Sequence, residues 1–306
     1  MSVSYSPAPV GALDGKVAIV TGAGRGIGRG EAIALAAEGA SVVVNDLDRD
    51  LAEGVVKELE ATGATAIANG DDISTWDGAR SLIAAATGTL GRLDILVNNA
   101  GFLRDSMSFS MDEAEWDAVV NVHLKGHFAP SKFAAEHWRA VAKAAGDDAQ
   151  PPGGAIVNTV SEAGLYGGTG QANYVAAKAG IAAMTIGLAR ELKRYGVRVN
   201  AIAPRARTRM TEELLGDFAA PKDGVFDEWD PDNIGPVVTW LASDATSDVN
   251  GQVFVVIGGR IHLFGGWELV SEIEQGERWT VEAIAARKAE LFGDRRSGIP
   301  TMGFGR

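Results

Sequence analysis

Short apolar runs alternate with longer stretches of helical pattern along most of the chain. The run Lys16–Thr21 predicts a buried strand, and the alanine-rich stretch Ile27–Glu38 after it predicts a helix. Strands that are apolar throughout and alternate with helices are typical of a parallel sheet covered on both faces. The pattern therefore predicts an α/β fold with a doubly wound, seven-stranded parallel sheet. The further strands are expected over Ser41–Asn45, Ala64–Ala68, Leu93–Val97, Ala155–Val160, Val197–Ile202 and Gln252–Val256.

The same pattern predicts how the chain divides. Residues 1–13 form a flexible tail, 14–260 one α/β domain, and 261–306 a C-terminal extension in which the alternation stops. A long helical region is expected over Asp112–Lys143, and one helix in the extension over Thr280–Phe292. Two interpretations of the extension stay open: a lid over the substrate mouth, or a cover for the core or a neighbouring subunit.

Composition excludes several classes of protein. A chain of 306 residues with 46% hydrophobic content can bury a large core. The absence of cysteine excludes disulfides and thiolate metal ligands, and we expect no metal site. A net charge of −12 argues against a nucleic-acid partner, which requires a basic face. The N-terminus has no secretory pattern and no apolar run reaches membrane-spanning length, so we expect a cytoplasmic protein with no membrane partner.

A glycine-rich turn between the first strand and the first helix predicts a dinucleotide site. Glycines let the backbone approach a pyrophosphate, which then rests on the helix N-terminus. Asp46 ends the second strand, where a carboxylate accepts hydrogen bonds from the ribose of NAD and repels the 2′-phosphate of NADP. Arg25 and Arg49 could reach a phosphate and favour NADP, but we weigh the acid more heavily and predict NAD. The turn residues expected to bind cofactor are Gly22, Arg25, Gly26, Ile27 and Gly28.

The stretch Ser161–Lys178 contains the candidate chemistry. Tyr174 and Lys178 are four residues apart and share one helix face. An ammonium beside a phenol favours the phenolate and lowers the tyrosine pKa. Ser161, before a glycine-rich turn, supplies a second hydroxyl. This set suits proton exchange with an alcohol or carbonyl oxygen, although Tyr-x-x-x-Lys by itself is more often a surface pair.

Together these motifs resemble the short-chain dehydrogenase/reductase family, which has a Rossmann fold. The resemblance extends to about Gly259 and includes the thirteen-residue spacing from Ser161 to Tyr174. It implies that Tyr174 is the acid/base, that Ser161 orients the substrate oxygen, and that Lys178 holds the nicotinamide ribose. Family members are usually dimers or tetramers formed through the helices of 112–143 and 171–195, so a homodimer or homotetramer is expected. The further cofactor contacts that it implies are Asp72, Ile73, Asn99, Ala100, Gly101, Pro204 and Thr208.

Two positions depart from the family pattern. His123 stands where the family has an asparagine that anchors a water in the proton relay. Histidine can relay a proton near neutral pH, so His123 is expected to be a fourth catalytic residue; a structural histidine is the alternative. Arg205 replaces the usual glycine after Pro204, which puts the conformation of that loop in doubt.

The residues within and around these motifs narrow the resemblance to the (3R)-hydroxyacyl-CoA dehydrogenase domain of peroxisomal multifunctional enzymes and its free-standing bacterial relatives. Arg104, Arg205 and Arg207 follow strand ends and could bind an anionic group such as a CoA phosphate; pairing with Glu212, Glu213 and other local acids is the alternative. We predict an NAD-dependent oxidoreductase that acts on CH–OH groups, with a 3-hydroxyacyl-CoA as favoured substrate. A dehydrogenase of a steroid-like or terpenoid ring hydroxyl, and a non-catalytic dinucleotide-binding regulator, are the alternatives.

Overall fold

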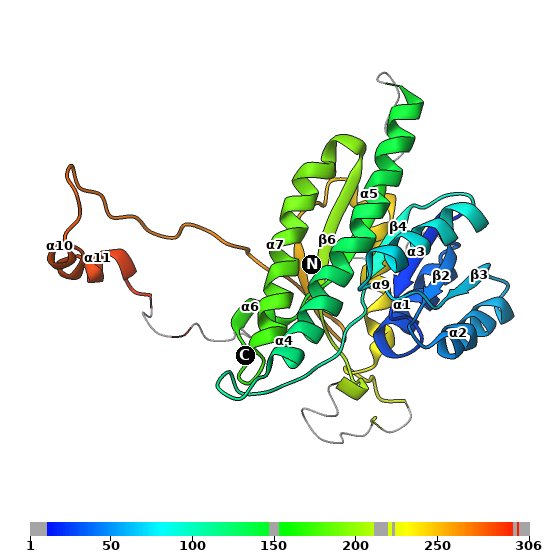
Figure 1. Cartoon of the computed structure of the whole chain (residues 1–306), viewed down its shortest axis with the longest axis horizontal. Coiled ribbons are helices and arrows are strands. Elements are labelled where there is room, and N and C mark those ends of the chain that lie inside the picture. Colours follow the sequence, from blue (N-terminus) through cyan, green and yellow to red (C-terminus); the bar gives the residue numbers. More distant parts are fainter. Residues whose placement is uncertain (1–10, 147–152, 211–219, 222–223, 296–298, 300–306) are drawn as a thin grey trace. The chain divides into compact units, whose positions relative to one another are not determined.

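A computed structural model describes residues 11–146, 153–210, 220–221, 224–295 and 299 (Figure 1). By its contacts the chain divides into two units, Met1–Phe264 and Gly265–Arg306. The first unit contains the sheet. The boundary predicted at residue 260 therefore falls inside the last strand of that sheet.

The first unit alternates strands and helices in the predicted order. The strands are β1 (Val17–Thr21), β2 (Ser41–Asn45), β3 (Ala66–Asn69), β4 (Ile95–Asn98), β5 (Gly154–Thr159), β6 (Val197–Arg205), β7 (Val253–Ile257) and β8 (Arg260–Leu263). The α-helices are α1 (Gly26–Ala37), α2 (Arg49–Ala61), α3 (Trp76–Thr89), α4 (Glu113–Val120), α5 (Gly126–Ala145), α6 (Glu162–Tyr166), α7 (Ala172–Leu192) and α9 (Gly235–Ala242). Side-chain caps begin several of them, such as Asp48 before α2 and Thr75 before α3.

The sheet has the order β3-β2-β1-β4-β5-β6-β7-β8. Strands β1–β7 are parallel, which confirms the doubly wound α/β prediction. The sheet has eight strands rather than seven, because the chain turns at Gly258, where φ is +50°, and returns as antiparallel β8. Sequence reasoning missed β8 because all four of its residues are exposed and give no buried apolar run.

Two apolar clusters cover the two faces of the sheet. One packs α1, α2 and α9 against the strands through residues such as Leu35 and Val238. The other packs α3, α5 and α7 through residues such as Leu82 and Trp138. Between β1 and β4 the strand order reverses, and in such sheets ligands bind at the carboxyl ends of the strands near this reversal.

The long helical region predicted over Asp112–Lys143 is present as α4 and α5, joined by a π-helical turn, η1 (Asn121–Lys125). Two local predictions need correction. The helix predicted over Thr280–Phe292 is two short helices, α10 (Val281–Ala286) and α11 (Lys288–Phe292). Leu13, in the segment expected to be a flexible tail, is fully buried, and its amide donates to Glu38 O; residues 1–10 lie outside the described range.

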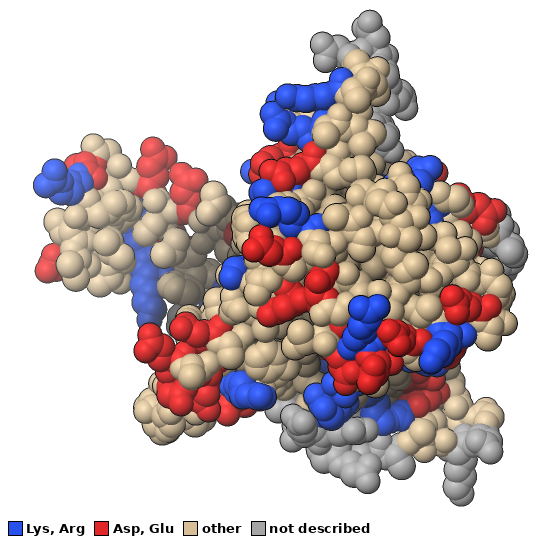
Figure 2. Space-filling model, turned by 45° about the vertical axis from the view of Figure 1, so that its right-hand side comes forward, with Lys and Arg blue, Asp and Glu red and all other residues tan. Residues whose placement is uncertain are grey.

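The second unit exposes apolar side chains, among them Trp267 and Leu269. Its described contacts include the Arg287 guanidinium over the Trp279 ring. Whether it is a lid or a subunit contact stays a prediction. None of the described helices is long and apolar enough to cross a membrane. On the face shown in Figure 2, basic side chains lie among acidic ones, which agrees with ion pairs such as Arg29–Glu58 and Arg80–Asp77.

Candidate active site

The glycine turn between β1 and α1 has a backbone that side chains would obstruct. Gly22 and Gly26 have φ of +63° and +55°, in the left-handed region that favours glycine. A Cβ on Gly22 would lie 2.8 Å from Ala100 Cα, and one on Gly28 would lie 2.5 Å from the Asn99 side-chain nitrogen. The turn thus leaves a cradle of bare backbone at the N-terminus of α1, which fits a pyrophosphate.

Asp46 lies against this turn. Its Oδ2 accepts a hydrogen bond from Gly24 N at 3.0 Å, and its Oδ1 accepts one from Asp48 N. The carboxylate is therefore fixed at the end of β2, beside the cradle. Arg25 is exposed, and Arg49 pairs with Glu53 on the surface of α2. The residues present fit a nicotinamide dinucleotide.

The predicted contacts after β3 and β4 lie at the same sheet edge. Asn99 Nδ2 donates to the carbonyl oxygens of Thr21 and Gly22. Asn99 thus braces the glycine turn, a role that the resemblance did not indicate. Asp72 accepts hydrogen bonds from the amide and hydroxyl of Ser74, and Ile73 is buried. Pro204 is part of β6, and Thr208 lies 3.7 Å from where a Cβ on Gly26 would be.

Ser161, Tyr174 and Lys178 come together as predicted. Ser161 is the N-cap of α6, directly after β5, and its hydroxyl hydrogen-bonds to Tyr174. Tyr174 and Lys178 share the buried face of α7. Lys178 Nζ lies 5.7 Å from the Tyr174 ring centroid and donates a 2.5 Å hydrogen bond to the carbonyl oxygen of Thr159.

The predicted effect of Lys178 on the Tyr174 pKa needs correction. Burial raises the pKa of Tyr174, the Ser161 hydrogen bond opposes this, and the charge of Asp105 adds to it. Burial also lowers the pKa of Lys178 to about 7, so the lysine is about half charged at neutral pH. Removal of water therefore outweighs the attraction between ammonium and phenolate in the chain without ligand.

His123 lies on the π-helical turn and is almost fully buried. Its Nε2 is 2.7 Å from the carbonyl oxygen and 3.1 Å from the amide nitrogen of Phe102. Burial and the charge of Lys178 lower the His123 pKa to about 3, although the Phe102 carbonyl opposes them. A charged imidazole is thus not populated at neutral pH in the chain without ligand, and the catalytic role of His123 stays a prediction. Gly101 lies against the ring, where a Cβ would be 2.1 Å from Cε1.

The two arginines after β6 are paired inside the chain. Arg205 forms an ion pair with Glu162, the residue after Ser161. Arg207 forms one with Asp227. Of the two interpretations left open, the structure shows pairing with Glu162 and Asp227; Glu212 and Glu213 lie outside the described residues. Arg104 lies over the Phe102 ring.

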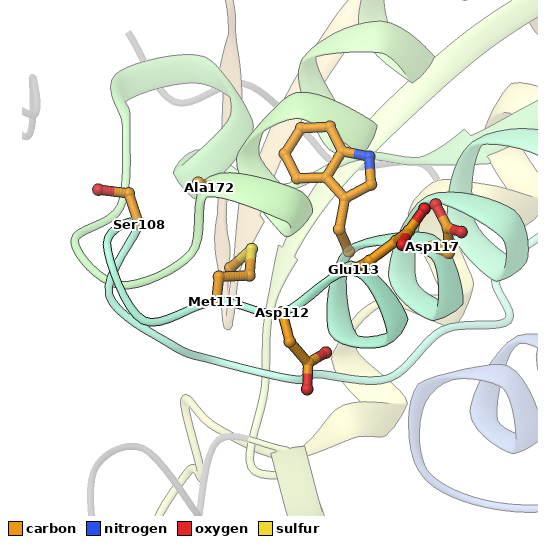
Figure 3. A pocket seen from close by; sticks show the side chains of 7 residues that line it. Ser108, Met111, Asp112, Glu113, Asp117 and Ala172 are labelled. Atoms are coloured by element: carbon orange, nitrogen blue, oxygen red, sulfur yellow. The ribbon is translucent and has the colours of Figure 1, made fainter.

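A hollow of about 540 Å³ opens where α4 and α7 begin (Figure 3). It is lined by Ser108, Met111, Asp112, Glu113, Trp116, Asp117 and Ala172. The catalytic candidates do not line it, and its three carboxylates repel phosphate, so it is unsuited to the phosphates of CoA or a dinucleotide. Among the described residues no cluster of acids and histidines could hold a metal ion.

The fold and the site define a class of enzyme. A family model described as short chain dehydrogenase matches residues 16–217, and the chain belongs to the short-chain dehydrogenase/reductase family. It is an oxidoreductase that acts on CH–OH groups, and the family uses nicotinamide dinucleotide cofactors.

Particular relatives agree with the predicted resemblance. The hydroxyacyl-CoA dehydrogenase ChsB1 of Mycobacterium tuberculosis is 47% identical over 289 residues, covering 92% of this chain and 90% of the relative. The peroxisomal multifunctional enzyme type 2 of Mus musculus is 38% identical over 255 residues, 81% of this chain and 32% of that protein. A crystal structure of a short chain dehydrogenase from Mycobacterium avium has a TM-score of 0.84 and 46% identity, covering 96% of this chain and all of that one.

Proposed function

We propose that the protein is an NAD-dependent 3-hydroxyacyl-CoA dehydrogenase. The observation that carries the reaction is the meeting of Ser161, Tyr174 and Lys178 after β5, at the same carboxyl edge of the parallel sheet as the glycine turn after β1. The substrate class is supported by the 47% identical relative named as a hydroxyacyl-CoA dehydrogenase, which matches nearly the whole chain.

When bound, the oxidised nicotinamide supplies a hydride acceptor for the carbinol carbon. The chain supplies the proton chemistry. Ser161 hydrogen-bonds the substrate oxygen, and the Tyr174 phenolate takes the hydroxyl proton, so the alcohol becomes a ketone. Lys178, as ammonium, stabilises the phenolate and holds the ribose. Because the Tyr174 pKa is raised in the chain without ligand, the phenolate depends on charge that arrives with the oxidised cofactor.

NAD is the proposed cofactor because Asp46 lies beside the cradle. Two backbone amides, those of Gly24 and Asp48, fix its carboxylate in place. A fixed negative charge there accepts ribose hydroxyls and repels a 2′-phosphate. The pairing of Arg49 with Glu53 reduces its availability for a phosphate.

The proposal is tested by a substrate panel followed by NADH absorbance. The panel contains (3R)- and (3S)-hydroxyacyl-CoA esters of several chain lengths, together with steroid and terpenoid ring alcohols. We expect the highest kcat/KM with a 3-hydroxyacyl-CoA. A higher value for a cyclic alcohol would favour the alternative substrate class, and NADH binding without turnover of any alcohol would favour the non-catalytic regulator.

We also propose a cytoplasmic homo-oligomer. Trp116 on α4 and Phe128 on α5 are 41% and 39% exposed, and large apolar side chains at a helix surface suit a subunit contact. Light scattering during size-exclusion chromatography tests the assembly. A monomer at micromolar concentration would contradict it.

A further inference from the structure

The helix that begins at the catalytic serine is too short to hold its place by its own hydrogen bonds. α6 is a single short turn of helix after Ser161, whose Oγ accepts a 3.2 Å hydrogen bond from Ala163 N. Isolated helices shorter than about 12–15 residues are marginal in water. Packing against neighbouring elements must therefore stabilise α6, and the position of the Ser161 hydroxyl depends on that packing.

Two of the contacts that hold α6 come from the parallel part of the sheet and its helices. Gly164 lies against α7, where a Cβ would be 2.6 Å from Lys178 Cβ. Glu162 forms an ion pair with Arg205 at the end of β6. Neither contact involves Tyr166, the last residue of α6.

Tyr166 packs against Phe264, the residue that directly follows β8. The two rings meet edge to face, with centroids 6.0 Å apart and an angle of 82° between their planes. Aromatic pairs prefer this geometry, and it contributes to their stability beyond the burial of apolar surface. The end of α6 is thus attached to the strand that the sequence did not predict.

The main chain fixes Phe264 against the sheet. Its amide donates to the carbonyl oxygen of Val253 at 2.9 Å, which extends the pairing of β7 and β8 by one residue. Leu263 pairs with Phe254, whose ring packs against Trp240 of α9. Because successive side chains of a strand point to opposite faces, Phe264 points to the α7 face of the sheet, where α6 packs.

We propose that Phe264 is a positioning residue for Ser161: through Tyr166 it fixes the end of α6, and with it the serine hydroxyl that orients the substrate oxygen. The consequence for turnover rests on the proposed function, whereas the consequence for α6 does not. Phe264 acts through Tyr166 and touches neither Ser161 nor the reacting atoms.

Hydrogen exchange of the chain without cofactor or substrate measures the opening of α6. The probes are the amides of Gly164 and Leu165, which both donate to the Ser161 carbonyl oxygen. We expect Phe264→Ala to raise their exchange rates about 2- to 10-fold, the value of an edge-to-face pair. Tyr166→Leu is expected to give the same rise, and the double variant no more than the larger single one. Phe264→Tyr, which keeps the ring, is expected to match wild type.

Leu263→Ala is the matched control. Leu263 is the preceding residue of the same edge strand and is exposed, but its side chain points to the α9 face. We expect its removal to leave the Gly164 and Leu165 amides unchanged. Unchanged exchange in Tyr166→Leu and in any folded Phe264→Ala, or an equal rise in Leu263→Ala, would overturn the proposal. If Phe264→Ala does not fold, Tyr166→Leu decides alone.

A double-mutant cycle in kcat connects α6 to the serine. We expect Phe264→Ala to lower kcat about 2- to 10-fold when Ser161 is present, with little change in KM. In a Ser161→Ala background we expect no further loss, because the displaced hydroxyl is already absent. An equal loss in both backgrounds would show a general structural defect and contradict the positioning role. Failure of the substrate panel would reject the proposed function and leave the exchange result standing.

Discussion

His123 and Tyr174 meet edge to face, with ring centroids 5.1 Å apart and an angle of 84° between their planes. Both rings are buried, and the imidazole is tied to Phe102 through Nε2. A neutral histidine thus packs against one side of the Tyr174 phenol. It acts through shape and hydrogen bonding rather than through charge.

We predict that His123 contributes no ionisation to catalysis between pH 5 and 8. Its pKa of about 3 leaves it neutral throughout that range. His123→Asn is therefore expected to lower kcat by less than the roughly 100-fold typical of losing an acid or base, with the pH profile of kcat/KM unchanged in shape. An acid limb near pH 6.5 in wild type that disappears in the variant would contradict this.

Tyr174→Phe is expected to lower kcat by about 10²- to 10⁴-fold, because the proton acceptor is lost. NADH binding is expected to stay close to wild type. Tyr195→Phe, on the turn after α7, serves as the control and is expected to keep full activity. Substantial turnover by the Tyr174 variant would reject the catalytic assignment.

Asp46→Asn tests cofactor choice while it keeps an acceptor for the Gly24 amide. Loss of the charge is expected to weaken NADH binding by about tenfold, the value of a charge-assisted hydrogen bond, and to strengthen NADPH binding. Asp50→Asn makes the same charge change in the first turn of α2 and is the control. Tighter binding of NADPH than NADH by wild type would reject the Asp46 argument.

Glu31 gives a stability prediction. It is fully buried, neither oxygen has a partner among the described residues, and burial raises its pKa to about 8 from 4.5. The Glu31 pKa is higher in the folded than in the unfolded chain. The protonated carboxyl therefore contributes fully to the free energy of unfolding below pH 4.5, and this contribution is lost as the pH rises to about 8. The loss is on the order of 5 kcal/mol by linkage.

Glu31→Gln is expected to remove this pH dependence. Urea unfolding at pH 5 and pH 8 measures it: the free energy of unfolding of wild type falls relative to that of the variant as the pH rises. Glu60→Gln, at an exposed position on α2, is expected to track wild type. Parallel stability curves for wild type and Glu31→Gln would show that the carboxyl is solvated.

The ion pair of Arg205 and Glu162 is expected to hold the Ser161 loop to the end of β6. Glu162 is 11% exposed, and burial raises its pKa despite the arginine. Arg205→Gln is expected to cost about 2 kcal/mol of stability through the lost charged hydrogen bond and to change the KM for acyl-CoA little.

The exposed pair Arg260–Glu228 supplies the comparison. Arg260→Gln is expected to cost less than about 1 kcal/mol, as surface pairs do. Double-mutant cycles measure both couplings. A large rise in KM specific to Arg205→Gln would assign that guanidinium to the substrate instead.

The sequence by itself determined the fold class and the choice of Ser161, Tyr174 and Lys178 as catalytic candidates. Short apolar runs such as Ser41–Asn45, rich in β-branched residues and followed by helical patterns, are typical of buried parallel strands, so their order along the chain predicts the doubly wound topology. Motifs confined to one turn or one helix face, such as the glycine turn or the pair Tyr174 and Lys178, could also be recognised from the sequence alone. Their geometry is local, and local geometry is encoded by short spacings.

Contacts and pKa values that depend on residues far apart in the sequence were decided only by the tertiary structure. It paired Arg205 with Glu162, 43 residues away, and gave Asn99 its role as a brace of the glycine turn. It also set the ionisation of Lys178, His123 and His127, because a pKa follows from burial and from nearby charges. The second histidine of the run 122–128 was visible in the sequence. Its full burial follows only from the packing of α5 in the folded chain.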